Sequence, residues 1–279
     1  MPVRLIALDI DGTLLDEHSR LPAINRNAVA EAAARGIEIA LVTGRRYDFA
    51  MPIAQQFPCP LTMIVNNGAL VKSSDGDTQL VNLLPRNIAS RVLDEALAFR
   101  ELASVCFNRP RENQVIYERI DWEDPLRGKY FERNREYLAE MSPLRECLTE
   151  DPIQVMFTGY ANQVREVESF LSQLPFSPEY SLAMTIYDKR DFGLVDVIAA
   201  GCSKGATLAE WVRRRGWSRE DVMAIGDNLN DLEMLQFAGL PVVMGNSVPE
   251  LKSLGWRETL SNDQGGVAAA IELYAFGDA

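Results

Sequence analysis

The sequence predicts an α/β fold, a doubly wound parallel sheet that is interrupted by an inserted α+β unit. Short apolar runs without polar alternation, such as residues 5–8 and 222–225, are separated by helical segments. Such runs are typical of strands covered on both faces, and the alternation of strands with helices implies right-handed parallel crossovers. This rhythm stops after residue 83 and returns only near Lys204, which predicts the insertion.

The elements before the insertion follow from local signals. The Ala-rich segment 25–35 is expected to be helical, and Gly36 is a suitable C-cap. A turn sequence at residues 73–77 separates two short runs and predicts a hairpin. The expected strands are residues 5–8, 37–42 and 63–65, followed by the hairpin over residues 70–81.

The inserted segment has its own pattern, in which apolar residues at helical spacing alternate with short strand-like runs. We expect helices over residues 88–99, 129–141 and 163–173, and strands over residues 104–108, 114–118, 153–158 and 182–187. Linkers near residues 83–86 and 188–192 would join this unit to the sheet. The predicted domains are therefore residues 1–83 with 191–279, and residues 84–190.

After the insertion, strands and helices alternate again. The expected helices are residues 203–215, 232–237 and 266–276, and the expected strands are residues 222–225 and 241–244. With these elements the core contains five strands of the doubly wound type.

Acidic side chains follow two of the predicted core strands. Asp9 and Asp11 come directly after the first strand, and residues 226–231, Gly-Asp-Asn-Leu-Asn-Asp, come directly after strand 222–225. Ligands bind beyond the carboxyl ends of parallel strands, and clustered carboxylates suit a divalent cation. An acidic surface turn is the alternative. An EF-hand is excluded, because Leu14 stands where the first loop would need Gly.

Five segments in this order resemble the haloacid dehalogenase superfamily, and specifically its Cof-type phosphatases with a large cap. They are residues 9–15, 43–45, 66–69, 203–205 and 226–231. The resemblance spans nearly the whole chain and implies a Rossmann-like core with an α+β cap domain. Two departures stand out: Ser247 occupies a position where the family often has Ala, and residues 252–258 match the usual pattern poorly.

The resemblance also implies roles for individual residues. Asp9 would be the nucleophile that forms an aspartyl phosphate, and Asp11 the general acid and then the base. The metal ligands would be Asp9, the main-chain carbonyl of Asp11, Asp227 and Asp231. The residues around the phosphoryl group and substrate would be Thr43, Gly44, Arg45, Asn67, Lys204 and Asn230. For Arg45 and Asn67, bracing of loops is the alternative role.

These residues together predict a magnesium-dependent phosphatase that acts on small phosphorylated metabolites. A phosphomutase of the same superfamily could share every catalytic residue, so the sequence leaves that alternative open. A non-catalytic protein that binds phosphorylated metabolites is the third possibility. Loss of function usually removes the nucleophile or the acid, whereas both are present here.

Composition excludes several other classes. The chain has 40 acidic and 28 basic residues, which argues against nucleic acid and anionic membranes as partners. The four cysteines are widely spaced and the single histidine, His18, lies in a loop-like stretch. We expect free thiols in a cytoplasmic protein, no zinc site, and a solvated histidine. The expected partner is a small phosphate ester, and the expected state is a monomer or weak homodimer.

Overall fold

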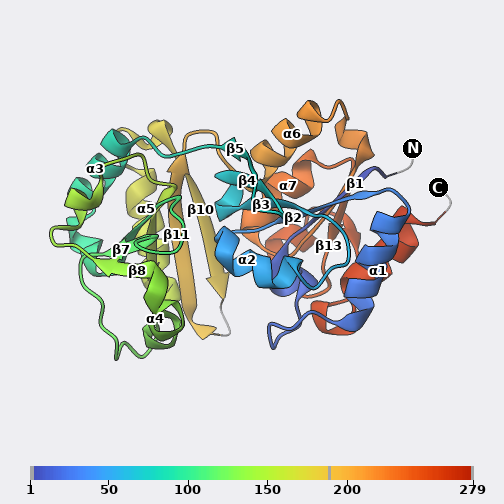
Figure 1. Cartoon of the computed structure of the whole chain (residues 1–279), viewed down its shortest axis with the longest axis horizontal. Coiled ribbons are helices and arrows are strands. Elements are labelled where there is room, and N and C mark those ends of the chain that lie inside the picture. Colours follow the sequence, from blue (N-terminus) through green and yellow to red (C-terminus); the bar gives the residue numbers. More distant parts are fainter. Residues whose placement is uncertain (1–2, 188–189, 278–279) are drawn as a thin grey trace. The chain divides into compact units, whose positions relative to one another are not determined.

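The computed structural model describes residues 3–187 and 190–277. The chain divides into two compact units, residues 1–81 with 202–279 and residues 82–201. In Figure 1 the first unit is blue to cyan and orange to red, and the inserted unit is mainly green and yellow.

The first unit is built on an eight-stranded sheet in the order β14-β13-β12-β1-β2-β3-β4-β5. Its first six strands in this order are parallel, and β4 and β5 add an antiparallel edge. The strands are β1 (Leu5–Leu8), β2 (Glu38–Val42), β3 (Thr62–Val65), β4 (Leu70–Ser73), β5 (Thr78–Val81), β12 (Val222–Gly226), β13 (Leu240–Val243) and β14 (Arg257–Glu258). The predicted parallel core is therefore confirmed.

Apolar residues bury the central strands on both faces. All four residues of β1 are fully buried. On one face, Leu5 and Ala7 pack in a cluster with Leu208 of α6 and Leu235 of α7. The helices of this unit are α1 (Ala23–Ala34), α2 (Tyr47–Ala54), α6 (Lys204–Arg214), α7 (Leu232–Phe237), α8 (Pro249–Lys252) and α9 (Gly266–Ala270).

The inserted unit contains a six-stranded mixed sheet in the order β10-β11-β9-β6-β7-β8. Its strands are β6 (Ala103–Cys106), β7 (Val115–Tyr117), β8 (Leu138–Glu140), β9 (Gln154–Gly159), β10 (Tyr180–Tyr187) and β11 (Phe192–Ala199), and its helices are α3 (Arg86–Glu95), α4 (Gly128–Asn134) and α5 (Ala161–Ser172). Val92 of α3 and Val167 of α5 share one apolar cluster with Phe157 and Val195 of the sheet. The predicted α+β unit is present.

The inserted unit ends at residue 201 and not at the predicted residue 190. Strand β11 pairs along its whole length with β10, and its residues 193–197 pair with β9, so it belongs to the inserted sheet. Its apolar composition resembles that of a core strand, and only the antiparallel pairing reveals its place. Residues 188–189 of the predicted linker lie outside the described residues.

The predicted helix over residues 129–141 is wrong in its second half. Helix α4 ends at Asn134, and residues 138–140 form β8, which pairs in parallel with β7. The backbone hydrogen bonds that the edge of β7 offers to this segment override its helical spacing.

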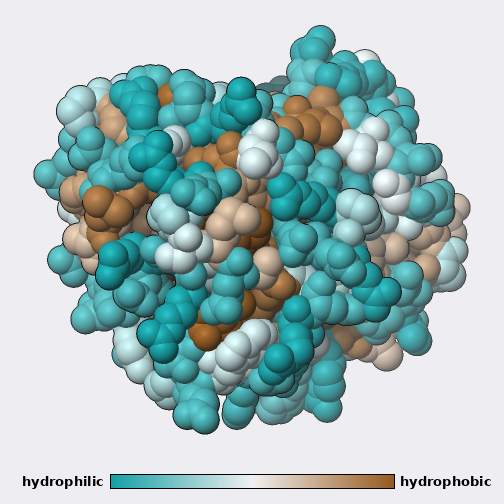
Figure 2. Space-filling model, turned by 60° about the vertical axis from the view of Figure 1, so that its left-hand side comes forward, coloured by the Kyte–Doolittle hydropathy of each residue, from teal (hydrophilic) through white to brown (hydrophobic). Residues whose placement is uncertain are grey.

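The face drawn in Figure 2 is mainly hydrophilic, with apolar residues gathered in smaller patches. Among the described residues, none of the helices combines the length and the apolar character that crossing a membrane requires. The four cysteines are free thiols, as expected.

Candidate active site

The first acidic loop begins where β1 ends. The amide of Asp9 donates a hydrogen bond of 3.1 Å to the carbonyl of Ile225, which extends the pairing between β1 and β12. The chain then turns through Gly12, whose φ is +82°. A Cβ atom at Gly12 would lie 2.3 Å from Oδ2 of Asp227, so this turn requires glycine for both conformation and space. The two acidic loops therefore approach each other closely at this point.

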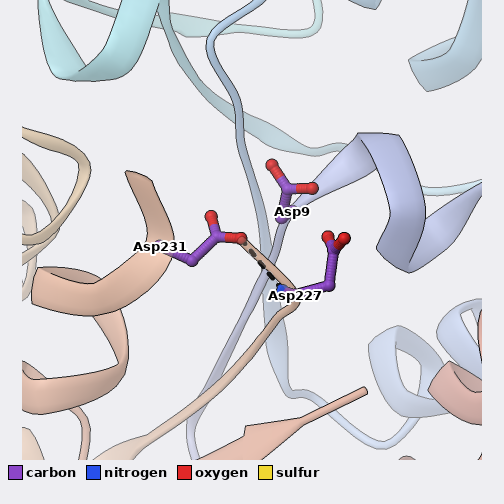
Figure 3. Close-up of side chains that lie close together, drawn as sticks. All are labelled: Asp9, Asp227 and Asp231. Carbon is purple, nitrogen blue, oxygen red and sulfur yellow. Dashed lines mark hydrogen bonds between the residues drawn. The ribbon is translucent and has the colours of Figure 1, made fainter. Parts of the chain in front are cut away.

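The second acidic loop follows β12 and is held by one of its own carboxylates. Oδ2 of Asp231 accepts hydrogen bonds from the amides of Asp227, at 3.0 Å, and Asn228, at 3.1 Å. The bond to the Asp227 amide is the dashed line in Figure 3. These bonds fix the loop and leave Oδ1 of Asp231 pointing away from it.

The carboxylates of Asp9, Asp227 and Asp231 form one buried cluster (Figure 3). One oxygen from each lies within 4.8 Å of the others, and the three residues are 4%, 8% and 0% exposed. Clustered carboxylate oxygens are the ligands that hard divalent cations prefer. The donor set therefore fits a divalent metal ion, as the sequence predicted.

Lys204 balances part of this negative charge. It is the first residue of α6, and its Nζ lies 2.6 Å from Oδ1 of Asp9 and 2.6 Å from Oδ1 of Asp231. Burial by itself lowers the pKa of Lys204, but the charges of Asp231 and Asp9 outweigh burial and raise that pKa above its usual value. The lysine is therefore a fixed cation, and the pair of carboxylates offsets its unfavourable position at a helix N-terminus.

The remaining charge of the cluster is unfavourable without a cation. Burial, together with the charges of Asp231 and Asp11, raises the pKa of Asp9 to about 7. Burial and the charges of Asp9 and Asp231 raise the pKa of Asp227 well above its usual value. Three carboxylates face one ammonium group, so a divalent ion would neutralise the excess and return both groups to their ionised forms.

Asp11 lies two residues after Asp9, and its side chain meets Arg45 of the loop after β2. Nε of Arg45 donates to Oδ2 of Asp11 at 2.6 Å, and Nη2 donates to Oδ1 at 2.6 Å. Both side chains are about one quarter exposed. The two roles considered for Arg45 are contact with the substrate and bracing of loops, and this hydrogen-bonded contact supports the bracing role.

The other predicted residues gather on neighbouring loops. Thr43 is buried after β2, and its Oγ1 accepts a bond from the Arg45 amide at 3.1 Å. Gly44 faces the side chain of Asn67, because a Cβ at Gly44 would lie 3.1 Å from Oδ1 of that residue. The Asn67 Oδ1 also accepts a bond of 3.4 Å from Nδ2 of Asn230. All the predicted site residues therefore lie at the carboxyl ends of core strands or on the adjoining loops and helix.

Asn67 has an unusual backbone conformation. Both Asn66 and Asn67 have positive φ, at +52° and +53°, and Gly68 follows at +100°. A Cβ at Gly68 would lie 2.3 Å from the carbonyl oxygen of Ser203, so the segment packs directly against the start of α6. Asparagine tolerates this left-handed region better than most residues.

Two residues for which the sequence alone indicates no role support the acidic loops. Thr13 Oγ1 donates to Oδ1 of Asp227 at 2.9 Å, and Nδ2 of Asn246 donates to the carbonyl of Gly12 at 2.8 Å. Thr13 could have been suspected, since it is a hydroxyl residue inside the acidic motif. His18 is exposed on a loop beside Glu17, as expected of a solvated histidine.

Three acids and a buried lysine, on loops at the carboxyl end of a parallel sheet, indicate a hydrolase-type site, and comparison with known proteins agrees. Residues 6–271 match the family of haloacid dehalogenase-like hydrolases. The chain belongs to this family. It is 27% identical to the 5-amino-6-(5-phospho-D-ribitylamino)uracil phosphatase of Bacillus subtilis, with 97% of each chain covered. It is 30% identical to an HMP-PP phosphatase of Serratia proteamaculans, with 90% of this chain and 87% of that protein covered.

Solved structures share the fold. A haloacid dehalogenase-like hydrolase of Bacteroides thetaiotaomicron matches with a TM-score of 0.78 and 26% identity, over 97% of this chain and 98% of that one. A HAD subclass IIB sugar phosphatase matches with a TM-score of 0.75 and 20% identity, over 99% of this chain and all of that one. The parallel core sheet with an inserted cap domain is thus the fold of this subclass.

Proposed function

We propose that the chain is a magnesium-dependent phosphatase of small phosphorylated metabolites and that Asp9 is its nucleophile. The observation that carries this proposal is the place of the Asp9 carboxylate, which is buried at the end of β1 and lies 2.6 Å from the ammonium group of Lys204. A fixed cation at this distance favours the ionised carboxylate that nucleophilic attack requires. The named activities of the relatives support hydrolysis over the phosphomutase alternative.

In the first step, an oxygen of Asp9 attacks phosphorus and the bond to the leaving alkoxide breaks. Asp11 gives a proton to that alkoxide, so the leaving group departs as a neutral alcohol. Lys204 and Thr43 neutralise and hydrogen-bond the phosphoryl oxygens while the charge on them changes. The product of this step is an aspartyl phosphate on Asp9.

In the second step, water attacks the phosphorus of the aspartyl phosphate. Asp11, which lost its proton in the first step, takes a proton from this water, and the bond between phosphorus and Asp9 breaks. Inorganic phosphate leaves and both aspartates return to their starting forms. The proton balance closes over the two steps because the same carboxyl group donates and then accepts.

Asp9, Asp227 and the main-chain carbonyl of Asp11 are the proposed ligands of Mg²⁺, with Asp231 as a further candidate. When bound, the ion would supply positive charge beside the phosphoryl oxygens and orient the phosphate for in-line attack. Asp231 already has Oδ2 bonded to two amides and Oδ1 bonded to Lys204. It is therefore better suited to orient the loop and the lysine than to serve as a primary ligand.

The residues of the inserted cap are proposed to select the substrate. Residues 82–201 form a unit with its own apolar core, and the proposed nucleophile, metal ligands and phosphate-binding residues all belong to the other unit. The chemistry of phosphoryl transfer is therefore separable from recognition of the leaving group. The cytoplasmic location and the monomeric or weakly dimeric state remain predictions from the sequence.

The test is an assay of purified protein with a panel of phosphorylated sugars, nucleotides and vitamins. We expect turnover with Mg²⁺ and loss of turnover after chelation with EDTA. Asp9→Asn should retain the fold, as judged by circular dichroism, but lose at least about 10³-fold in turnover, since an amide is a poor nucleophile. Activity of Asp9→Asn within tenfold of the wild type would exclude the covalent mechanism.

A further inference from the structure

The loop after β13, residues 244–248, is anchored to the second acidic loop. The Met244 amide donates to the carbonyl of Gly226 at 3.1 Å, and the Val248 amide donates to the carbonyl of Asp227 at 3.1 Å. Ser247 Oγ also lies 3.4 Å from the carbonyl oxygen of Gly226. Residues 244–248, which we call the bracing loop, are therefore held against the backbone of Gly226 and Asp227 by hydrogen bonds.

Asn246 joins the bracing loop to the first acidic loop. Its Nδ2 donates to the carbonyl of Gly12 at 2.8 Å, and its Oδ1 accepts from the amide of Asn262 at 2.9 Å. The residue is exposed, yet both ends of its side-chain amide bond to the backbone of other segments. An exposed asparagine loses rotamer freedom when it is held in this way, so the arrangement fixes the geometry of the groups it joins.

The peptide group that Asn246 holds lies in a sensitive place. The Gly12 carbonyl belongs to the peptide between Gly12 and Thr13, and Thr13 Oγ1 donates to Oδ1 of Asp227. The preceding peptide carries the Asp11 carbonyl, one of the proposed metal ligands. Gly12 has no side chain that could hold this turn, and its φ of +82° is open to glycine at little cost. The hydrogen bond from Asn246 is therefore the side-chain contact that holds the carbonyl of this peptide directly.

We propose that Asn246 is a positioning residue for the metal site. It fixes the peptide after Gly12, and the rest of the bracing loop fixes Gly226 and Asp227, so one short segment sets the spacing between the two acidic loops. This inference rests on the proposed function, because it requires that these loops bind a divalent cation. Outer contacts that orient metal ligands commonly change metal affinity by 10-fold to 100-fold when they are removed.

The test measures Mg²⁺ binding to the substrate-free protein by titration calorimetry, for the wild type and for Asn246→Leu and Asn246→Asp. Leucine has a similar shape but no polar atoms. Aspartate can still accept from the Asn262 amide but cannot donate to Gly12, and its charge by itself favours cation binding. We expect the dissociation constant for Mg²⁺ to rise at least about tenfold in both variants.

Asn27→Ala is the control, because Asn27 lies on the exposed side of α1. This variant should bind Mg²⁺ within about twofold of the wild type. At saturating Mg²⁺, the KM of the Asn246 variants for substrate should stay near the wild-type value, whereas a general loss of structure would change it.

The outcomes separate the inference from the proposed function. If the wild type binds Mg²⁺ and hydrolyses phosphate esters but both Asn246 variants bind Mg²⁺ within twofold of it, the positioning role is wrong and the phosphatase stands. The positioning role is also wrong if the Asn246 variants have a lower thermal stability in EDTA but an unchanged affinity for Mg²⁺. If the wild type itself neither binds Mg²⁺ nor hydrolyses phosphate esters, the proposed function fails and the inference fails with it.

Discussion

Arg45 holds both carboxylate oxygens of Asp11, with two hydrogen bonds of 2.6 Å from Nε and Nη2. This bidentate geometry fixes the plane of the carboxyl group as well as its position. Asp9 faces Lys204, whereas Asp11 faces Arg45, so two aspartates two residues apart have different partners. That difference matches the two roles proposed for them, one as nucleophile and one as acid and base.

The first prediction concerns the effect of Arg45 on the leaving group. Arg45→Met should lower kcat/KM for an alkyl phosphate about 10²-fold, but kcat/KM for p-nitrophenyl phosphate less than about fivefold, because kcat/KM reports only the step in which the leaving group departs. The alkoxide needs the proton that Asp11 supplies, whereas p-nitrophenolate leaves without one. Steady-state kinetics on both substrates would check this, with Arg26→Met on the surface of α1 as the control.

A double variant sharpens this test. If Arg45 acts by orienting Asp11, then Arg45→Met should add little to the loss already caused by Asp11→Asn. Equal fractional losses on the two substrates would instead indicate that Arg45 contacts the phosphoryl group, which was the other role that the sequence suggested.

The second prediction concerns the charge balance of the cluster. Lys204→Met removes the ammonium group that lies 2.6 Å from both Asp9 and Asp231. Breaking such a buried pair leaves carboxylates without a partner, so the free energy of unfolding in EDTA should fall by about 3–5 kcal/mol. Urea denaturation followed by tryptophan fluorescence would measure it, with the exposed Lys129→Met as the control. A change no larger than that of the control would contradict the ion pairs.

The third prediction concerns pH in the absence of metal. The pKa of Asp9 is about 7 in the folded protein and 3.8 in its ordinary environment, so between these values the folded state binds a proton that the unfolded chain has lost. The free energy of unfolding should therefore fall as the pH rises through this window. The raised pKa of Asp227 acts in the same direction.

Urea denaturation in EDTA at several pH values from about 5 to about 8 would check that slope. Asp9→Asn should make the slope shallower, because the amide does not titrate. Saturating Mg²⁺ should also reduce it, since a bound cation keeps the carboxylates ionised at lower pH. A wild-type slope that Asp9→Asn leaves unchanged would mean that other groups cause it.

The parallel core and the acidic cluster could be predicted because their signals are local. Apolar runs mark β1 and β12, and the carboxyl ends of neighbouring strands in one sheet necessarily meet. The proximity of Asp9 and Asp227 could therefore be predicted without knowing how the loops fold. The family resemblance, rather than the pattern itself, supplied their separate roles.

The parts that the sequence did not predict depend on partners distant along the chain. Strand β11 looks like a core strand until its antiparallel pairing with β10 is known. The bond from Asn246 to Gly12 joins residues 234 positions apart, and the side chain of an exposed asparagine carries no periodic signal. The pairing of Arg45 with Asp11 likewise follows from the placement of two loops, which local pattern does not determine.

The last prediction separates backbone strain from contact at Gly12. Gly12 and Gly36 have similar φ values, +82° and +86°, but a Cβ at Gly12 would lie 2.3 Å from Oδ2 of Asp227, whereas a Cβ at Gly36 would have nothing within 4 Å. Both Gly12→Ala and Gly36→Ala should lose about 1–3 kcal/mol of stability from strain. Only Gly12→Ala should also displace Asp227, and so weaken Mg²⁺ binding and turnover at least about tenfold. Calorimetry and kinetics on the two variants would decide this, and equal Mg²⁺ affinity in both would show that the approach of the two acidic loops is not needed for the metal site.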